Sequence, residues 1–253
     1  MRAVPLLAIL ALAFAGCLSP DDPAPLPGPV AIPEPDEGPW RGFEAEGCIA
    51  LVFVAEVPGS WVAPLLAEGY DAGLDGNPHL RASRCESIVV DNTTYHDVSW
   101  AESGVLLRAA NGYENDGSDH YVFELVFDTA AVPRLAALLA EDGWPVVDAT
   151  VTVSADRIQV EGSGLVYEAV IVGQPEATST RAGPTRFHRM AAEPLYCDFE
   201  GSDGAQVTAW PTTLSAQGGA WGAIAQGPGT LAGVTQQDFP SGRYLLHKGI
   251  SGD

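Results

Sequence analysis

The sequence predicts an α+β fold, mostly antiparallel strands with two or three flanking helices. Short runs rich in Val, Ile, Tyr and Phe recur between residues 48 and 172, and turn residues separate them. Only two segments have convincing helical spacing. Few helices beside one large set of strands indicate α+β rather than an alternating α/β fold. No linker interrupts residues 41–253, so we predict a single domain there.

The strand segments are joined by short polar connectors. Ala155-Asp156 and Gly162-Ser163-Gly164 are typical of turns between neighbouring antiparallel strands. Beyond Pro184 the pattern weakens, and the strands expected there are short. The expected strands are Cys48–Glu56, Cys85–Asn92, Thr94–Trp100, Gly104–Ala110, His120–Asp128, Val146–Ser154, Arg157–Glu161 and Leu165–Val172, followed by Thr185–Ala191, Leu195–Phe199, Ala205–Trp210 and Gly242–His247.

Two helices are expected. Gly59–Glu68 has Ser60 as a candidate N-cap, and Pro64 at the end of the first turn predicts a short or irregular helix. Ala130–Asp142 follows Thr129, a second candidate N-cap, and its leucines line one face.

The charge of the chain excludes several classes of partner. The chain has 33 Asp and Glu residues against 12 Lys and Arg, a net charge of -21, and its only lysine is Lys248. Nucleic-acid binding requires a basic stripe that releases counterions, so we expect no nucleic-acid partner. Attachment to anionic lipids through a polybasic patch is excluded for the same reason. The oligomeric state stays open.

The first 40 residues are expected to direct export and anchoring. Residues 1–16 carry an early Arg, an apolar run too short to span a membrane, and small residues before Cys17. This resembles a lipobox, which implies cleavage before Cys17 and lipid on its sulfur; a plain secretory signal is the alternative. Residues 17–40 are rich in proline and acidic residues, which predicts a stiff tether. Either reading places residues 41–253 outside the cytoplasm, and in the lipoprotein reading the lipid is the only membrane contact.

Three cysteines remain if Cys17 carries lipid. One disulfide and one thiol is the expected outcome outside the cytoplasm. Among the three pairings we favour Cys48 with Cys85, because both open strands that could be neighbours. Three buried thiols are the alternative. Asn92 opens an Asn-Thr-Thr glycosylation sequon, which matters only if the host glycosylates exported proteins.

Motifs for metals and cofactors are missing from the sequence. The five histidines show no HExxH or HxH spacing, and the cysteines show no CxxC spacing. No Walker loop, dinucleotide fingerprint or GxSxG elbow occurs either. We therefore expect no metal and no cofactor.

Three charged residues stand inside apolar strand segments: Arg108, Glu124 and Glu168. Burying a lone charge is costly, so each must face water, a partner or a cavity. The solvated face of an antiparallel sheet explains all three without any function. On the inside of a closed sheet, an Arg–Glu pair would instead bind a polar group of a ligand.

Two phrases resemble the acetoacetate decarboxylase-like superfamily. Val52–Tyr70 reads VFVAEVPGSWVAPLLAEGY, a strand and short helix that end in an LLxEGY phrase. Leu135–Ala149 reads LAALLAEDGWPVVDA, a helix followed by GWPV. They are similar to the family's LLPxGF-type phrase and to its later GfPK motif. The resemblance spans residues 48–172 and implies a large antiparallel β-cone around an apolar cavity.

The resemblance also implies the loss of the family's chemistry. In active members the lysine of GfPK forms a Schiff base with a β-keto acid. Here Gly143-Trp144-Pro145 match the motif, and Val146 stands at the position of the lysine. Valine cannot form an imine, and arginine cannot substitute for lysine because its guanidinium stays protonated. We therefore assign no catalytic residue.

The function expected from the sequence is that of an exported, membrane-anchored protein that binds a small, largely apolar molecule without decarboxylase activity. The residues expected to line its cavity are Arg108, Glu124, Trp144 and Val146. One alternative is a lysine-independent enzyme, a hydratase, cyclase or aldol-type lyase, that uses Glu124, Glu168 or His120 as acid or base. Another is a structural or adhesive surface lipoprotein with a filled core.

Overall fold

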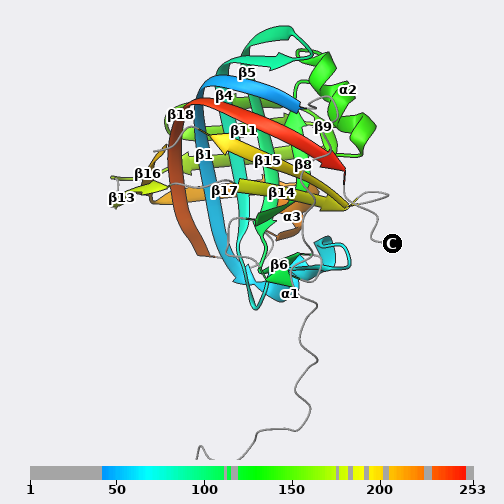
Figure 1. The fold of residues 1–253 in the computed structure, drawn as a ribbon. Helices are drawn as coiled ribbons and strands as arrows, with labels where there is room; N and C mark the ends of the chain where they lie inside the picture. Colours follow the sequence, from blue (N-terminus) through cyan, green and yellow to red (C-terminus); the bar gives the residue numbers. More distant parts are fainter. Residues whose placement is uncertain are drawn as a thin grey trace, which may run out of the picture.

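The computed structural model describes residues 42–110, 113–114, 119–174, 177–181, 185–190, 194–201, 205–224 and 230–248. The predicted signal peptide, Cys17 and the tether lie outside these residues. The described part is mostly strand, with three α-helices, and the α+β prediction is confirmed (Figure 1).

The large sheet curls into a cone whose strands return to the first one. β1 (Gly42–Pro58) pairs on one edge with β4 (Pro78–Val90) and on the other with β18 (Thr230–Lys248). From β4 the hydrogen-bonded neighbours run through β5, β8, β14 and β15 to β18, and only β8–β14 is parallel (Figure 1). The bounds of these strands are β5 Thr93–Leu106, β8 Asp119–Phe127, β14 Thr185–Met190 and β15 Pro194–Gly201.

The other described strands extend or cover the cone. The large sheet also contains β3 (Asp75–Gly76), β9 (Val146–Asp148), β13 (Ala177–Arg181) and β16 (Ala205–Trp210). A four-stranded antiparallel sheet contains β10 (Thr150–Val153), β11 (Arg157–Gly162), β12 (Leu165–Ile171) and β17 (Thr212–Gln217). A third, small sheet contains β2 (Tyr70–Asp71), β6 (Ala109–Ala110) and β7 (Tyr113–Glu114).

The first helix is as short as its proline predicts. α1 spans Gly59–Val62 and continues as a 3-10 turn, Ala63–Leu65, which has the proline in its first turn. Ser60 is not its N-cap, because the helix starts after Pro58 and has no side-chain cap.

The other two helices also depart from the predicted boundaries. α2 spans Pro133–Asp142, and Val132 rather than Thr129 occupies the N-cap. The helix ends at Gly143, whose left-handed φ of 91° is the conformation that favours glycine. α3, Gly219–Ile224, was not predicted.

Several strands are longer than predicted, among them β1 and β18, and the differences in β4 and β5 decide where the candidate site lies. β5 runs through residues 101–103, which the prediction left as a connector, and β4 begins at Pro78 rather than Cys85. Glu102 and His79 therefore stand inside strands, although the prediction placed both outside them.

The Cys48–Cys85 pair forms a disulfide, the pairing that the sequence favoured. The two residues are directly opposite on β1 and β4. Cys197 lies buried on β15 and is not part of a disulfide. Asn92, with φ of 60°, lies exposed in the tight turn between β4 and β5.

The apolar side chains gather in two cores on opposite faces of the curled sheet. The cone core lies inside the curl, with side chains from all seven strands that encircle it and from α2. Its members include Phe43, Cys85, Trp100, Val122, Phe187, Cys197, Tyr244 and Leu139. The second core lies between the large sheet and the four-stranded sheet, and includes Trp221 of α3.

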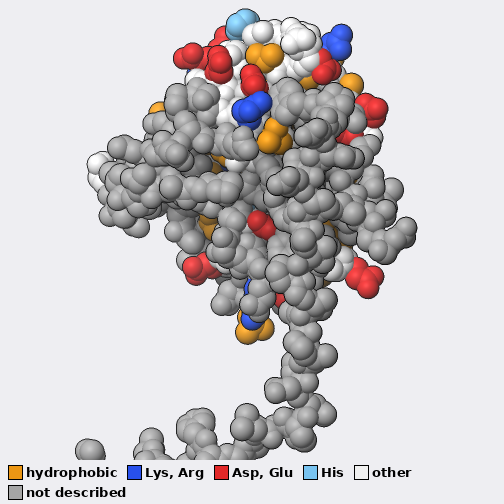
Figure 2. Space-filling view, in the orientation of Figure 1, with side chains coloured by type: hydrophobic (Ala, Val, Ile, Leu, Met, Phe, Trp, Pro, Cys, Tyr) orange, Lys and Arg blue, Asp and Glu red, His pale blue; other side chains and the backbone are white. Residues whose placement is uncertain are grey.

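The described surface carries the acidic character of the chain. Figure 2 shows Asp and Glu side chains scattered over one face, with a few Arg side chains among them. Within the described residues, no helix is long and apolar enough to cross a membrane.

Candidate functional site

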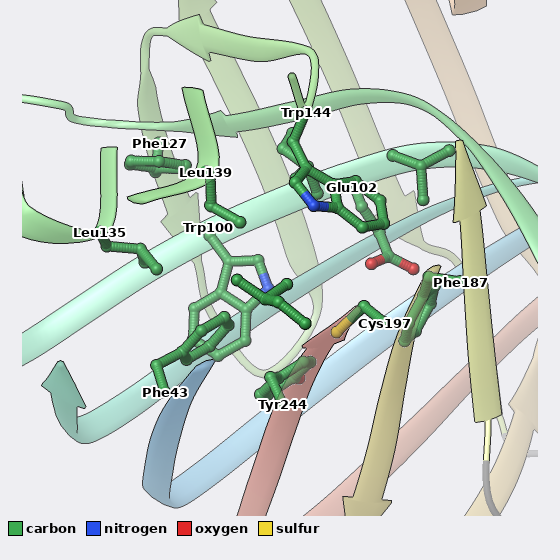
Figure 3. Close-up of a pocket in the computed structure, with 13 residues that line it drawn as sticks. Phe43, Trp100, Glu102, Phe127, Leu135, Leu139, Trp144, Phe187, Cys197 and Tyr244 are labelled. Carbon is green, nitrogen blue, oxygen red and sulfur yellow. The ribbon is translucent and has the colours of Figure 1, made fainter. Parts of the chain in front are cut away.

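A small pocket opens inside the cone core, between the strands and α2. Its volume is about 40 Å³, counted as the space open to the centre of a water-sized sphere. By that measure one water needs roughly 10–15 Å³, so the pocket has room for a few water-sized groups. Its walls are Phe43, Trp100, Glu102, Val122, Leu125, Phe127, Leu135, Leu139, Trp144, Phe187, Cys197, Tyr244 and Leu246 (Figure 3).

The polar groups of this apolar pocket include those of Glu102, Trp144 and Tyr244. Glu102, Trp144 and Tyr244 are each at most 5% exposed. Within the described residues, the indole N–H of Trp144 and the hydroxyl of Tyr244 have no hydrogen-bond partner. Figure 3 shows the carboxylate of Glu102 and the indole of Trp144 directed into the pocket. A buried polar group without a partner costs roughly 1–3 kcal/mol, so these groups are placed to receive a ligand.

Glu102 is also the first member of a buried chain of titratable groups. Its Oε1 lies 3.5 Å from Nε2 of His79, which is itself 1% exposed. Nδ1 of His120 lies 3.3 Å from the same Nε2 of His79. The two rings meet edge to face, with 4.5 Å between their centroids. The three groups therefore form one continuous contact path from the pocket wall to the start of β8.

The ring of His79 fits because its cross-strand partner is a glycine. His79 on β4 faces Gly104 on β5 in the register. A Cβ at residue 104 would lie 2.8 Å from Cε1 of His79 and 2.5 Å from the carbonyl oxygen of Tyr121. Any larger residue would displace the imidazole from Glu102.

A buried arginine supplies the opposite charge. Arg81 on β4 is directly opposite Glu102 on β5, and its guanidinium lies over the rings of Phe187 and Phe199 at 5.7 and 5.1 Å. Burial raises the pKa of the Tyr244 hydroxyl well above its usual range. The positive charge of Arg81 lowers this pKa, and the negative charge of Glu102 raises it. Tyr244 is therefore a hydrogen-bond donor at neutral pH.

Comparisons with known proteins find no matching family model and no matching curated sequence. Solved structures do match. An acetoacetate decarboxylase-like enzyme from Sphingomonas wittichii RW1 has a TM-score of 0.57 at 10% identity, over 83% of this chain and 94% of that one. Acetoacetate decarboxylase from Legionella pneumophila has a TM-score of 0.52 at 12% identity, over 88% and 93%.

A third match is the enduracididine biosynthesis enzyme MppR, complexed with the condensation product of pyruvate and imidazole 4-carboxaldehyde. Its TM-score is 0.51 at 13% identity, over 87% of this chain and 92% of that one. The chain has the acetoacetate decarboxylase-like fold. Identities this low establish the fold alone, so residue roles must come from the geometry of this chain.

On this decarboxylase-like scaffold, one of the four expected lining residues is in the pocket. Trp144, between α2 and β9, contributes its indole to the wall. Val146 begins β9 opposite Leu125, is half-buried and packs against the cone core without lining the pocket. Arg108 is exposed beside Gly73, so it does not face the interior.

Glu124 lies on the other face of the sheet, in the second core. Its carboxylate accepts hydrogen bonds from Ser103 Oγ at 2.8 Å, Tyr167 Oη at 2.9 Å and the backbone N–H of Ala220 at 2.9 Å. Burial and the neighbouring Glu124 carboxylate raise the pKa of Tyr167 far above its usual range. This carboxylate joins β5, β8, β12 and α3, and its donors leave it little capacity for a ligand.

The other residues proposed for acid–base chemistry are divided between surface and interior. Glu168 is partly exposed beside Arg157, with 3.6 Å between their charged atoms. His120 is 7% exposed and belongs to the buried path from the pocket. Among the described residues, no group of three or more His, Cys, Asp or Glu side chains is placed to hold a metal.

The sequence-based prediction missed His79, Arg81, Glu102 and Tyr244. One signal was present: in PHLRAS the polar His79 and Arg81 alternate with Leu80 and Ala82, which is the period of a strand with a polar inner stripe. Glu102 lacks such a signal, since alanine and serine flank it in a segment that reads as a turn.

Proposed function

We propose that this chain binds a small, largely apolar, neutral molecule in the cone pocket, without Schiff-base chemistry. The observation that carries the proposal is the pocket itself, in which Trp144 and Tyr244 present buried donors without partners among the described residues. Ligand pockets commonly combine apolar walls with a few such polar groups, which orient the ligand. The ligand would place its hydrogen-bonding group at these donors and its apolar part against the rings.

The size of the pocket limits the ligand. About 40 Å³ of open space holds a ligand, or the end of one, with only a few non-hydrogen atoms. MppR, which has the same fold, is complexed with a small organic condensation product, and this supports a small-molecule role for the interior of the cone. The valine at residue 146 supports a role without an imine, because no amine stands at that motif position.

We also propose that the protein acts outside the cytoplasm, held at a membrane by lipid on Cys17. The sequence of residues 1–40 supports this location. The Cys48–Cys85 disulfide supports it independently, since structural disulfides persist in oxidising compartments and are rare in the cytosol.

Native mass spectrometry of the full chain from its own host, extracted in detergent, tests the binding proposal. We expect a bound small molecule in the wild type and its loss in Val122→Leu, which puts an extra methylene into the pocket. Leu138→Met is the matched control, because Leu138 is buried in the same core but does not line the pocket. Wild-type protein that carries no ligand, and is not stabilised by small neutral ketones or alcohols, would overturn the proposal.

A further inference from the structure

The pocket places a carboxylate where a bound neutral ligand must touch it. Glu102 is 4% exposed and is the only acidic side chain among the described lining residues. A buried carboxylate in an apolar wall costs free energy unless it is used in binding, charge pairing or chemistry. Nε2 of His79 lies 3.5 Å from its Oε1, and this oxygen accepts no hydrogen bond within the described part of the chain, so the carboxylate keeps acceptor capacity.

The same pocket contains both kinds of group that enolisation requires, a base and hydrogen-bond donors. Removing a proton from the carbon beside a carbonyl requires a base at that carbon and hydrogen-bond donors at the carbonyl oxygen, where negative charge develops. The N–H of Trp144 and the O–H of Tyr244 are such donors, and both line the same small space as Glu102. The carboxylate and the two donors therefore border one small space.

The buried path behind Glu102 offers its proton a second site. Nε2 of His79 lies 3.5 Å from Oε1 of Glu102, and Nδ1 of His79 lies 3.4 Å from Nδ1 of His120, so each nitrogen of the His79 ring has a neighbour. His79 does not line the pocket, so it acts through Glu102 as a positioning residue. The absence of a side chain at Gly104 leaves the space in which the His79 ring lies.

We propose that Glu102 is the general base of an enolisation site for small neutral ketones, a role that rests on the binding function proposed above. The Glu102 carboxylate takes the proton from the α-carbon, the C–H bond breaks, and its electron pair moves to form an enolate. Trp144 and Tyr244 donate hydrogen bonds to the enolate oxygen. The proton on Glu102 then returns to carbon, or exchanges with solvent before it returns. The cycle needs no oxidant, metal or amine.

The charges around Glu102 suit this step. Arg81, directly across the strand pair, offsets the negative charge of Glu102 in the absence of ligand. The other titratable groups that face this region are His79, His120, Tyr244 and Cys197. An anionic β-keto acid would bring a second negative charge against Glu102, which favours a neutral ketone as the ligand class.

Deuterium exchange into acetone, the smallest ketone, tests the proposal. Acetone is incubated with the purified full chain in D₂O, and its α-protons are followed by NMR. We expect exchange above the buffer rate, and a loss of at least about 100-fold in Glu102→Gln, the range typical for removing a general base. Glu168→Gln changes an exposed carboxylate and is the matched control. Lys248→Arg should exchange like the wild type, which separates carboxylate chemistry from amine chemistry.

Acetone binding, measured in parallel by saturation-transfer NMR, separates the two proposals. Binding without exchange by the wild type would overturn the enolisation site and leave the binding function intact, whereas no binding would overturn both. Exchange that persists in Glu102→Gln would also overturn the role of Glu102. If Glu102→Gln does not fold, Trp144→Phe replaces it: the ring stays, the donor is lost, and exchange should slow more than binding weakens. His79→Gln should slow exchange while acetone still binds.

Discussion

Removing the Cys48–Cys85 disulfide should destabilise the protein strongly. The bond closes a loop with a sequence separation of 37 residues, and both cysteines are at most 2% exposed. A loop of that length loses conformational freedom in the unfolded chain worth about 4 kcal/mol. For a domain of roughly 200 residues, this corresponds to a fall in Tm of about 8–16 °C. The double variant Cys48→Ala/Cys85→Ala should show this fall in a thermal or urea unfolding experiment.

Cys197→Ala is the control for the loss of buried sulfur. Cys197 is buried in the same cone core but is not in a disulfide, so its replacement removes a buried sulfur without breaking a cross-link and should cost about 1 kcal/mol. Wild-type protein made in a reducing cytoplasm should unfold like the double variant until it is oxidised. A double variant within about 1 kcal/mol of the wild type would refute the reasoning, because the cross-link would then not restrict the unfolded chain.

Two further predictions concern carboxylates outside the pocket. Glu124→Gln should lower the free energy of unfolding, measured in urea, by about 2 kcal/mol. The substitution weakens charge-assisted hydrogen bonds from three donors. Glu168→Gln, at an exposed ion pair, should cost under about 1 kcal/mol, and equal effects of the two variants would contradict the assignment. Hydrogen bonds from Thr129 hold the pKa of Asp148 below its ordinary value of 3.8. Its stabilisation is therefore present above that pH and lost as the pH falls through the lowered pKa. The difference in Tm between wild type and Asp148→Asn should shrink toward zero below pH 3.8, and a difference independent of pH would refute the assignment.

Sequence reasoning succeeded where the signal is local. The turn around Ser163 joins two strands at a residue with φ of 48°, and the apolar face of α2 packs into the cone core as its leucine spacing predicts. Trp144, which the phrase GWPV singled out through the family resemblance rather than through any periodicity, lines the pocket, and its role in binding stays a prediction. In each case neighbouring residues in the chain are enough to define the feature.

The same reasoning failed for the charged residues because the direction of a strand side chain depends on register. Arg108, in an apolar run, faces water, and Glu124 faces the second core beside a register shift between Ser103 and Gly104. Such an irregularity moves side chains to the other face of a sheet, since their period is two. Glu102, in a segment that reads as a turn, faces the pocket instead.

The sequence by itself determined the fold class and favoured the disulfide that the structure contains. These features follow from composition, local periodicity and short phrases. Only the tertiary structure decided that β18 returns to β1, because pairing between residues as far apart in the chain as Gly42 and Leu245 leaves no local pattern. It is this curl that brings Glu102, Trp144 and Tyr244, from β5, the α2–β9 connection and β18, around one apolar space.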